Sequence, residues 1–456
     1  MLKLVDYDMV INDGKIIDVI KKKILKANIG IVRDKIACIS EEKLTGKRVI
    51  EARGKIVSPG FIDFHSHVDA KVFSATCIAK QGGTTTIGGE RSFDGKAIRK
   101  IEEDGFLINH GFYISHSFTL RTAAGIKDPY RPATRREIKD MVNLACKFFE
   151  NGAFGIHFGL EFVPGTSEEE IIKLSEVAKN YEKVVLVHLR KDGRESLKYF
   201  NEIIQAARIT GASIHMFHLM YMIGYKGVVD KAIGILENAI SDGIDITADT
   251  GLYSAFPCCI GSSILDEGWE KGYVNVNVKD LLISSGIYAG KRCTNEMFKF
   301  LREEFPYTLV TAFVCDNDAI EKLLKKEYIF VSTNAADGPH YENIGHPETA
   351  GTFPRLIHQY VKKKETIDII EAIRKITILP ATRFKIKNKG LLSEGADADI
   401  TIFDYEKIKD NANYIGRGNP NEPPVGIEHV IVNGKVIFEN NDIDITLKPG
   451  KRLKAV

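Results

Sequence analysis

The middle of the chain alternates short apolar runs with helical patterns, and this alternation limits the possible folds more than any other feature. Runs with the length and composition of buried strands recur along it, at residues 61–65, 84–88, 112–116, 154–158, 184–188, 213–218, 244–249 and 329–333. Amphipathic segments such as 135–150, 168–181 and 229–241 lie between them. Strands that alternate with helices form parallel sheets, because each helix carries the chain back to the start of the next strand. Eight such units predict an α/β protein, a (β/α)8 TIM barrel rather than an open sheet.

The two ends of the chain have a different pattern, that of short antiparallel strands. Residues 1–57 contain alternating apolar runs separated by turn signals, and residues 388–456 include Asn433-Gly434 between two such runs. Asn-Gly between alternating apolar residues is a strong hairpin signal. We therefore expect residues 1–57 and 388–456 to form one small β-sandwich domain beside a barrel of residues 58–387. Residues of about 258–325 exceed an ordinary loop and predict an insertion over the barrel mouth.

The composition is that of a globular protein whose charges are balanced. Of the 456 residues, 44% are hydrophobic, and 63 Lys and Arg nearly balance 61 Asp and Glu. The net charge of +2 gives no electrostatic footprint for nucleic acid or an anionic membrane, so we expect neither as a partner. No apolar run approaches the roughly 20 residues needed to span a bilayer. Seven dispersed cysteines without CxxC spacing are typical of reduced thiols, so we expect a cytoplasmic protein. The sequence leaves open whether the protein forms a homo-oligomer.

Histidines fall at the carboxyl ends of the predicted strands, where barrel enzymes place their catalytic groups. His65 and His67 end the first strand run, and side chains at i and i+2 of a strand point to the same side. His188 and His218 end the fifth and sixth runs, and Asp337 follows the eighth. One such histidine alone is more often structural, but the whole set is specific. Imidazole and carboxylate ligands in this number predict a transition-metal site, with zinc the best fit among common ions.

With these residues in place, the sequence resembles the amidohydrolase superfamily over almost its whole length. Within that superfamily it is similar to the N-acyl-D-amino-acid deacylases (D-aminoacylases). The superfamily hallmark is the run 56–67, which contains the His65 and His67 pair. The closer resemblance rests on the runs 120–121, 130–134, 152–156, 159–165, 346–355, 390–400 and 432–434.

The resemblance implies that metal-activated water cleaves a non-peptide C–N bond, an amide, in a small-molecule substrate. It implies that His65 and His67 hold the more exposed metal, and that His188 and His218 hold the deeper one. Asp337 would be a ligand and the catalytic acid–base group, which takes a proton from the bound water and returns it to the leaving nitrogen.

The sequence departs from the family at the ligand that bridges two metals. Superfamily members often carry a carboxylated lysine on the fourth strand, and the deacylases carry a cysteine after the second, but residues 154–162 and 88–92 contain neither. Glu90 stands at the place of the cysteine, and our hypothesis is that it bridges the ions, as a glutamate does in adenine deaminases of the superfamily. The alternative is a solvated loop carboxylate or a partner of Arg91. We expect one or two zinc ions, with Mn or Fe as alternatives because an oxygen bridge suits them.

Further departures concern the substrate. Met220 and Glu348 replace a lysine and an arginine that resemble anchors for the substrate's α-carboxylate. Loss of two cations and gain of an anion disfavour a free carboxylate, so we expect a substrate that is neutral or cationic at that end. Arg190 and Arg355 are candidate anion contacts or structural salt-bridge partners. Tyr253 is a candidate donor to the oxyanion, or an aromatic residue packed against the insertion.

Three alternatives to hydrolysis of a linear amide stay open. The first is hydrolysis of a cyclic amide or ureide, as in dihydroorotases and hydantoinases, and the second is deamination. The third is a non-catalytic scaffold that has lost its chemistry. The complete set of four histidines and one aspartate argues against the scaffold, because unused sites are not retained by selection.

Overall fold

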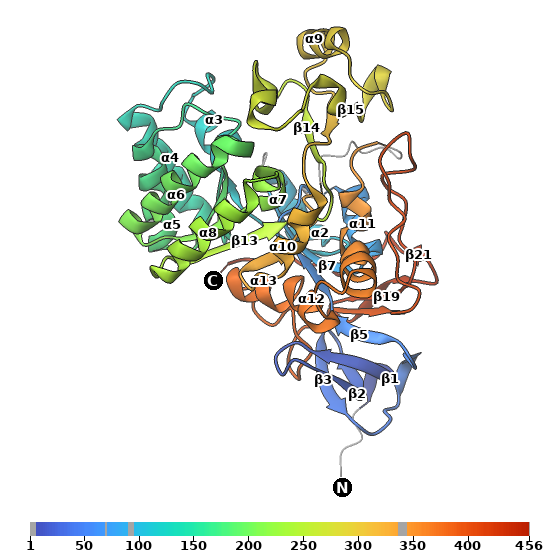
Figure 1. Cartoon of the computed structure of the whole chain (residues 1–456). Coiled ribbons are helices and arrows are strands. Elements are labelled where there is room, and N and C mark those ends of the chain that lie inside the picture. Colours follow the sequence, from blue (N-terminus) through green and yellow to red (C-terminus); the bar gives the residue numbers. More distant parts are fainter. Residues whose placement is uncertain (1–5, 69–70, 90–94, 336–343, 456) are drawn as a thin grey trace.

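The structure is a computed structural model that describes residues 6–68, 71–89, 95–335 and 344–455 (Figure 1). Glu90 and Asp337, two residues of the predicted metal site, lie outside the described residues. The roles expected for them therefore stay predictions.

Parallel strands form the middle of the chain. One sheet contains β6 (Phe61–Asp63), β7 (Gly83–Gly88) and β8 (Asn109–Phe112). A second contains β9 (Ile114–Ser115), β10 (Gly155–Gly159), β11 (Val184–His188), β12 (Ser213–Met216), β13 (Ile246–Thr250) and β17 (Ile329–Val331), paired in chain order. Each apolar run predicted from the sequence overlaps one of these strands, and the third run begins at the last residue of β8 and includes β9.

The two parallel sheets are linked at both edges. Only Tyr113 separates β8 from β9 along the chain. At the other edge Ser66, after β6, forms a parallel bridge with Ala335, after β17, and the Asn334 amide donates to the His65 carbonyl at 3.0 Å. The strand order therefore returns to its starting point, as a closed sheet requires.

Helices connect the strands and begin where the sequence supplies caps. They are α1 (Val72–Lys80), α2 (Gly95–Asp104), α3 (Arg121–Ala123), α4 (Arg135–Glu150), α5 (Glu168–Asn180), α6 (Ser196–Thr210), α7 (Leu219–Ile223), α8 (Val229–Ser241), α9 (Asn295–Glu304), α10 (Asn317–Leu324), α11 (Glu348–Arg355), α12 (Ile369–Lys375) and α13 (Ile378–Arg383). At α4 the Thr134 side chain accepts from the Glu137 amide while the Glu137 carboxylate accepts from the Thr134 amide. In the described part of the chain, no helix has the length and apolarity that crossing a membrane requires.

The two ends of the chain meet in one nine-stranded sheet, in agreement with the expectation that they join. The N-terminal part supplies β1 (Tyr7–Asp18), β2 (Lys23–Val32), β3 (Lys35–Ser40), β4 (Gly46–Glu51) and β5 (Ile56–Pro59), and the C-terminal part supplies β18 (Ile400–Phe403), β19 (Ile427–Val432), β20 (Lys435–Glu439) and β21 (Asp442–Ile443). The junction is the antiparallel pair β5–β18. Asn433 and Gly434 have φ angles of 46° and 75° and turn β19 into β20, so the Asn-Gly hairpin is confirmed.

The segment between β13 and β17 forms a small layer of its own. Strands β14 (Phe256–Cys259), β16 (Leu309–Ala312) and β15 (Leu281–Ile283) pair antiparallel in that spatial order. Figure 1 shows β14, β15 and α9 at the opposite end of the molecule from β1, β2 and β3. Helix α10 falls within the expected insertion but packs against β13 and β17, so it continues the strand–helix alternation.

Candidate metal centre and substrate pocket

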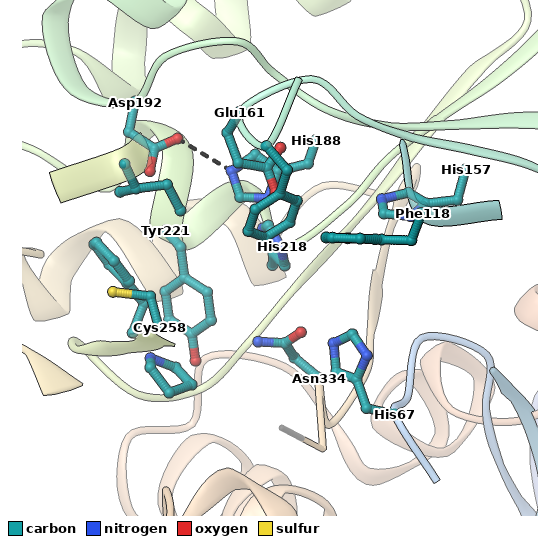
Figure 2. A pocket seen from close by; sticks show the side chains of 14 residues that line it. His67, Phe118, His157, Glu161, His188, Asp192, His218, Tyr221, Cys258 and Asn334 are labelled. Carbon is teal, nitrogen blue, oxygen red and sulfur yellow. Dashed lines mark ion pairs between the residues drawn. The ribbon is translucent and has the colours of Figure 1, made fainter. Parts of the chain in front are cut away.

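A pocket lies beside the carboxyl ends of the parallel strands (Figure 2). Its polar wall is formed by His67, His157, Glu161, His188, Asp192, His218, Tyr221 and Asn334, and its apolar wall by Phe118, Phe162, Phe256, Pro257, Cys258 and Ile264. The apolar wall comes largely from the segment that begins at β14. The pocket therefore combines strand-end histidines with a hydrophobic side suited to a small organic molecule.

The structure brings together the four histidines predicted as ligands. The ring centroids of His188 and His218 lie 4.3 Å apart, and those of His65 and His218 lie 4.9 Å apart. His65 and His67 are separated by 6.4 Å between ring centroids. His188 ends β11, and His218 follows β12 with a left-handed φ of 30°, which turns the chain into α7.

Asp249, at the end of β13, orients two of these histidines. Its Oδ2 lies 2.9 Å from Nδ1 of His65, and its Oδ1 accepts from the backbone amide of His218 at 2.5 Å. Burial raises the pKa of Asp249, but the charge and hydrogen bond of His65, together with those of His215, outweigh it and bring the pKa to about 2. Because the ionised Asp249 accepts from Nδ1, the lone pair of His65 is left on Nε2, as a metal ligand requires.

His218 also has the properties of a metal ligand. Burial lowers its pKa well below the usual value, and the nearby His188 and His65 lower it further. Its Nδ1 is buried and has no hydrogen-bond partner among the described residues. A buried neutral imidazole with an unused nitrogen fits a metal ion chemically, because metal binding compensates the nitrogen that burial has removed from water.

His188 lies between two buried carboxylates. Oε1 of Glu161 is 3.0 Å from its Nδ1, and Oδ1 of Asp192 is 3.4 Å from its Nε2. Burial lowers the pKa of His188, but Glu161 and Asp192 outweigh burial and raise it above the usual value. Sequence reasoning missed both carboxylates. The signals were the place of Glu161 just after the fourth strand run and the spacing of Asp192 four residues after His188.

The described residues alone do not present a finished coordination site. Within 6–68, 71–89, 95–335 and 344–455, no three His, Cys, Asp or Glu side chains are already grouped as ligands of one ion. The expected bridge Glu90 and the expected ligand Asp337 lie outside these ranges. The ligand roles of the four histidines therefore stay predictions that their proximity supports.

Three of the residues considered for substrate contact are held elsewhere. The Arg190 guanidinium binds Glu202, with its closer contact at 2.6 Å, and lines a neighbouring pocket rather than the histidine pocket. Tyr253 donates to the Pro347 carbonyl at 3.3 Å, and the guanidinium of Arg355 lies 4.5 Å from its ring centroid. Arg190 and Arg355 thus form ion pairs, Arg355 with Asp410 at 3.0 Å, and Tyr253 contacts Pro347 and Arg355. The substrate roles considered for these residues stay predictions.

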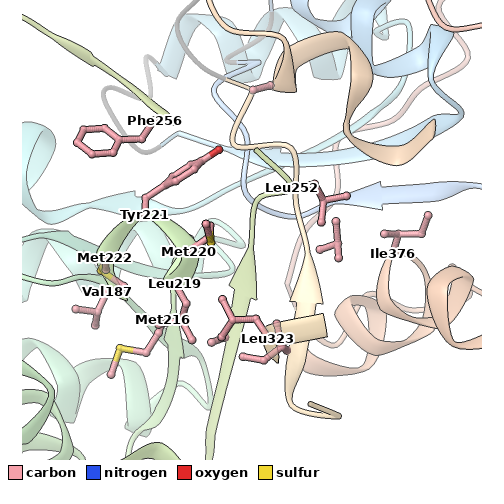
Figure 3. Close-up of a cluster of buried hydrophobic side chains, with 14 of the residues drawn as sticks. Val187, Met216, Leu219, Met220, Tyr221, Met222, Leu252, Phe256, Leu323 and Ile376 are labelled. Carbon is pink, nitrogen blue, oxygen red and sulfur yellow. The ribbon is translucent and has the colours of Figure 1, made fainter. Parts of the chain in front are cut away.

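Met220 and Glu348 lie behind the pocket wall. The side chain of Met220 is fully buried in an apolar cluster with Leu219, Met222 and Leu252 (Figure 3). Met220 therefore does not line the pocket, and any effect on the substrate would be indirect.

Glu348, the first residue of α11, holds two residues that do line the pocket. Its side chain is fully buried and accepts hydrogen bonds from the Tyr221 hydroxyl and, at 3.2 Å, from the Asn334 amide. Burial raises the pKa of Glu348 well above its usual value. Sequence reasoning missed Tyr221 and Asn334, because only the folded chain shows that both meet Glu348.

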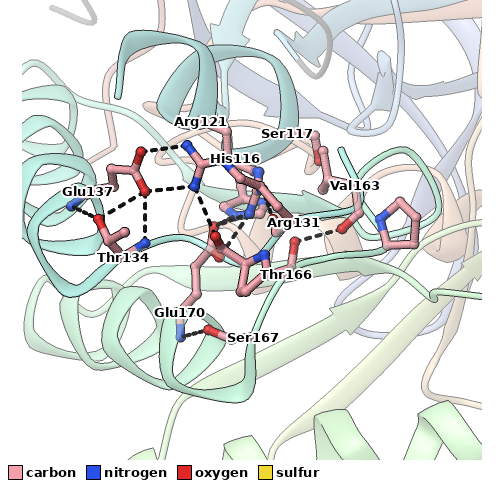
Figure 4. A network of polar contacts seen from close by, with 12 residues as sticks. His116, Ser117, Arg121, Arg131, Thr134, Glu137, Val163, Thr166, Ser167 and Glu170 are labelled. Carbon is pink, nitrogen blue, oxygen red and sulfur yellow. Dashed lines mark hydrogen bonds and ion pairs between the residues drawn. The ribbon is translucent and has the colours of Figure 1, made fainter. Parts of the chain in front are cut away.

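A second cluster of buried polar side chains supports the pocket where η1 (His116–Leu120) borders it (Figure 4). This short helix carries Phe118, which lines the pocket. The Glu170 carboxylate accepts from Arg121 at 2.8 and 2.9 Å and lies 2.7 Å from Nε2 of His116. His116 is not a lining residue of the pocket. This group joins η1 to the first turn of α5.

Comparison with known proteins agrees with this geometry. The family profile described as "Amidohydrolase family" matches residues 56–437. The chain belongs to the amidohydrolase family. It is similar to two proteins of Alcaligenes xylosoxydans xylosoxydans, an N-acyl-D-glutamate deacylase (25% identical, covering 94% of this chain and 93% of the relative) and a D-aminoacylase (25% identical, 95% of each).

Among solved structures, this amidohydrolase resembles an N-acyl-D-glutamate deacylase from Bordetella bronchiseptica in complex with zinc and a phosphonate inhibitor. The TM-score is 0.86 at 23% identity, over 99% of this chain and 100% of that one. The chain is therefore a metal-dependent hydrolase that acts on C–N bonds other than peptide bonds. The predicted reaction class is confirmed, and the scaffold alternative is wrong.

Proposed function

We propose that this amidohydrolase cleaves the amide bond of a small, non-peptide molecule in the pocket of His67, His188 and His218, with zinc as its metal. The observation that carries the proposal is the convergence of these histidines and His65 at the ends of parallel strands, with Asp249 orienting His65 and His218. Nitrogen ligands favour zinc, and Mn or Fe is the alternative if an oxygen ligand bridges two ions.

Each ligand would have a separate task. His65 and His67 would hold one ion, and His188 and His218 a second, with Glu90 between them. A bound zinc ion lowers the pKa of water to about 7 and polarises the carbonyl under attack. Asp337 would accept the proton of the attacking water and give it to the leaving nitrogen.

We also propose that the parallel strands close into a (β/α)8 barrel of residues 58–387. The bridge from Ser66 to Ala335 and the chain continuity from β8 to β9 support closure. Residues 1–57 and 388–456 would form the separate β domain, and residues of about 258–325 the insertion beside the pocket.

The pocket supports a substrate without a free carboxylate. None of the described residues that line it is lysine or arginine, whereas Glu161 and Asp192 are carboxylates. Tyr221 and Asn334 offer neutral hydrogen-bonding groups. Such a wall suits a neutral or cationic group, because an anion there would meet like charge without a partner. The same neutral groups favour a cyclic amide or ureide as the second candidate substrate, ahead of deamination.

The test is metal quantification followed by hydrolysis of a substrate panel. The panel contains N-acyl-D-amino acids, the amides and esters of the same compounds, and cyclic ureides. We expect the amides, esters or ureides to be hydrolysed with a higher kcat/KM than the free acids. A preference for the free acids would contradict the substrate proposal while leaving the reaction class intact.

We propose the cytoplasm as the location. All seven cysteines lie in the described residues and are free thiols. Free thiols are typical of a reducing compartment.

A further inference from the structure

A second cavity lies at the amino-terminal ends of the parallel strands, whereas the histidine pocket lies at their carboxyl ends. Val184 begins β11, Ser213 begins β12 and Asp245 directly precedes β13. Residues of α12 and α13 form the other side, and Figure 1 shows both helices away from β14 and α9. This basal cavity has a volume of about 730 Å³ and is lined by Ile20, Lys179, Glu182, Lys183, Val184, Ser213, Asp245, Thr247, Phe330, Arg374, Ile378, Leu379, Thr382, Arg383 and Lys385.

The lining of the basal cavity has more cations than carboxylates. It contains five lysine or arginine side chains against two carboxylates, which gives it a net charge of +3. Both carboxylates are already paired inside the cavity, Asp245 with Arg383 at 2.5 Å and Glu182 with Lys385 at 2.8 Å. Lys179, in the last turn of α5, forms no ion pair with any of the described residues. An anion could therefore bind there without displacing an existing ion pair.

The positive charges of the cavity affect one another. Burial, together with the charge of Lys385, lowers the pKa of Lys183. A nearby like charge disfavours the charged form of a side chain, and a nearby opposite charge favours it. A negative group within the basal cavity would therefore be attracted by its lining.

The remaining lining is apolar. Val184 and Phe330 are buried in the hydrophobic cluster between the strands, and Ile378 and Leu379 are half-buried on α13. Ile20, in the turn after β1, is 58% exposed although it is a large apolar residue. Sites for small organic molecules combine an apolar surface with a few polar groups that fix the orientation of the ligand. The basal cavity has both parts.

We propose that the basal cavity binds a small organic anion, a carboxylate or phosphate ester with an apolar body. The anionic group binds at Lys179, and the apolar body covers Ile378 and Leu379. A neutral compound gains no charge-assisted contact in this cavity, and an inorganic anion leaves the apolar lining in water. The described residues that line the basal cavity are all different from those that line the histidine pocket. The proposal therefore does not depend on the function proposed above.

Calorimetric titration of the full-length protein tests the ligand class. Phenyl phosphate is the probe, because it joins an anionic group to an aromatic ring. Benzyl alcohol is its neutral counterpart, and inorganic phosphate is the anion without an apolar body. We expect phenyl phosphate to bind at least about tenfold more tightly than either of them. We also expect its Kd to rise with added NaCl, because salt screens the attraction.

Lys179→Glu and Lys173→Glu form a matched pair that tests the place of binding. Both lysines lie on α5, and both substitutions change the net charge equally. Lys173 is paired with Glu176 at 2.8 Å and does not line the basal cavity. We expect Lys179→Glu to weaken the binding of phenyl phosphate by at least about fivefold, and Lys173→Glu to change it by less than about twofold. Circular dichroism checks the folding of each variant.

The other outcomes contradict the proposal in distinguishable ways. Absence of phenyl phosphate binding at millimolar concentration would overturn it, and equally tight binding of benzyl alcohol would refute the requirement for an anion. Equal weakening in both lysine variants would indicate a general effect of charge. Binding that Lys179→Glu leaves unchanged would place phenyl phosphate outside the basal cavity. If Lys179→Glu does not fold, Lys179→Gln and Lys173→Gln take the place of the pair, and the same comparison decides.

Discussion

At the scale of single residues, Glu348 connects the buried core to the pocket. It is fully buried, yet the two side chains that donate hydrogen bonds to its carboxylate, Tyr221 and Asn334, line the pocket. A carboxylate in this place sets the position of a phenol and an amide without touching the cavity itself. Its influence on the substrate is therefore one of positioning.

Replacement of Glu348 tests this arrangement. Glu348→Ala is expected to lower the free energy of unfolding by about 1–3 kcal/mol, because two buried polar groups lose their partner. Urea unfolding of the metal-free protein measures the loss. Glu348→Gln is the control, since its amide oxygen still accepts a hydrogen bond and the expected loss is smaller. Equal stability of the alanine variant and the wild type would show that Tyr221 and Asn334 are satisfied in another way.

At the scale of elements, the start of α4 depends on Glu137. Its carboxylate accepts from Arg131 at 2.6 and 3.0 Å and from the Thr134 amide at 2.7 Å, so it fixes the preceding loop as well as the helix (Figure 4). The hydrogen bond from Arg131, aided by the Thr134 amide, lowers the pKa of Glu137 from 4.5 to about 2. The charged form is thus the one that stabilises the helix start.

This shift predicts a pH dependence with a definite sign. The unfolded chain binds a proton at Glu137 near pH 4.5 and the folded chain only near pH 2, so its contribution is complete above pH 4.5 and is lost as the pH falls toward 2. At about pH 6 we expect Glu137→Gln to be less stable than the wild type by under about 1 kcal/mol. The measurement is thermal unfolding of both proteins from about pH 6 to about pH 3. A difference that widens as the pH falls would contradict the assignment.

At the scale of the whole molecule, a buried polar network joins the nine-stranded sheet to the parallel strands. Asp399, just before β18, accepts from the ammonium of Lys389 at 2.6 Å and from the amide of Asn109 in β8 at 3.0 Å. The backbone amide of Asn433 donates to the same carboxylate at 2.7 Å. Residues from three distant parts of the chain therefore meet at one buried charge.

The network predicts unequal effects for two neighbouring carboxylates. Asp399→Ala is expected to lower the free energy of unfolding by about 3–5 kcal/mol, because Lys389 is 97% buried and loses a buried partner. Asp397→Ala is the matched control. Asp397 also binds Lys389, at 2.9 Å, but is more exposed, so a smaller loss is expected. Urea unfolding measures both, and equal losses would refute a special role for Asp399.

The strands and the histidine cluster were accessible from the sequence because both depend on local rules. A strand of period two and a helix of period 3.6 are set by neighbouring residues, and the carboxyl ends of parallel strands meet at one edge. His188 and His218 were therefore predicted to lie together, and their rings are 4.3 Å apart.

Side-chain direction and pairing required the tertiary structure. Met220 follows His218 by two residues, yet it points into the core because α7 begins between them. Arg190 meets Glu202 from the next helix, and Glu348 meets Tyr221 across 127 positions of sequence. No local pattern encodes such distances, because long-range packing selects among the rotamers that a residue can adopt.

The amino-acid sequence by itself determined the class of fold, the family and the positions from which a metal is expected to be held. Only the tertiary structure decided that Glu161 and Asp192 flank His188, that Glu348 lies behind the pocket wall and that Arg190 is held by Glu202. The physical reason is the range of the forces involved. The periodicity of helices and strands depends on residues close in sequence. Buried charged side chains instead pair with residues that folding brings near them, because an unpaired buried charge has a large free-energy cost.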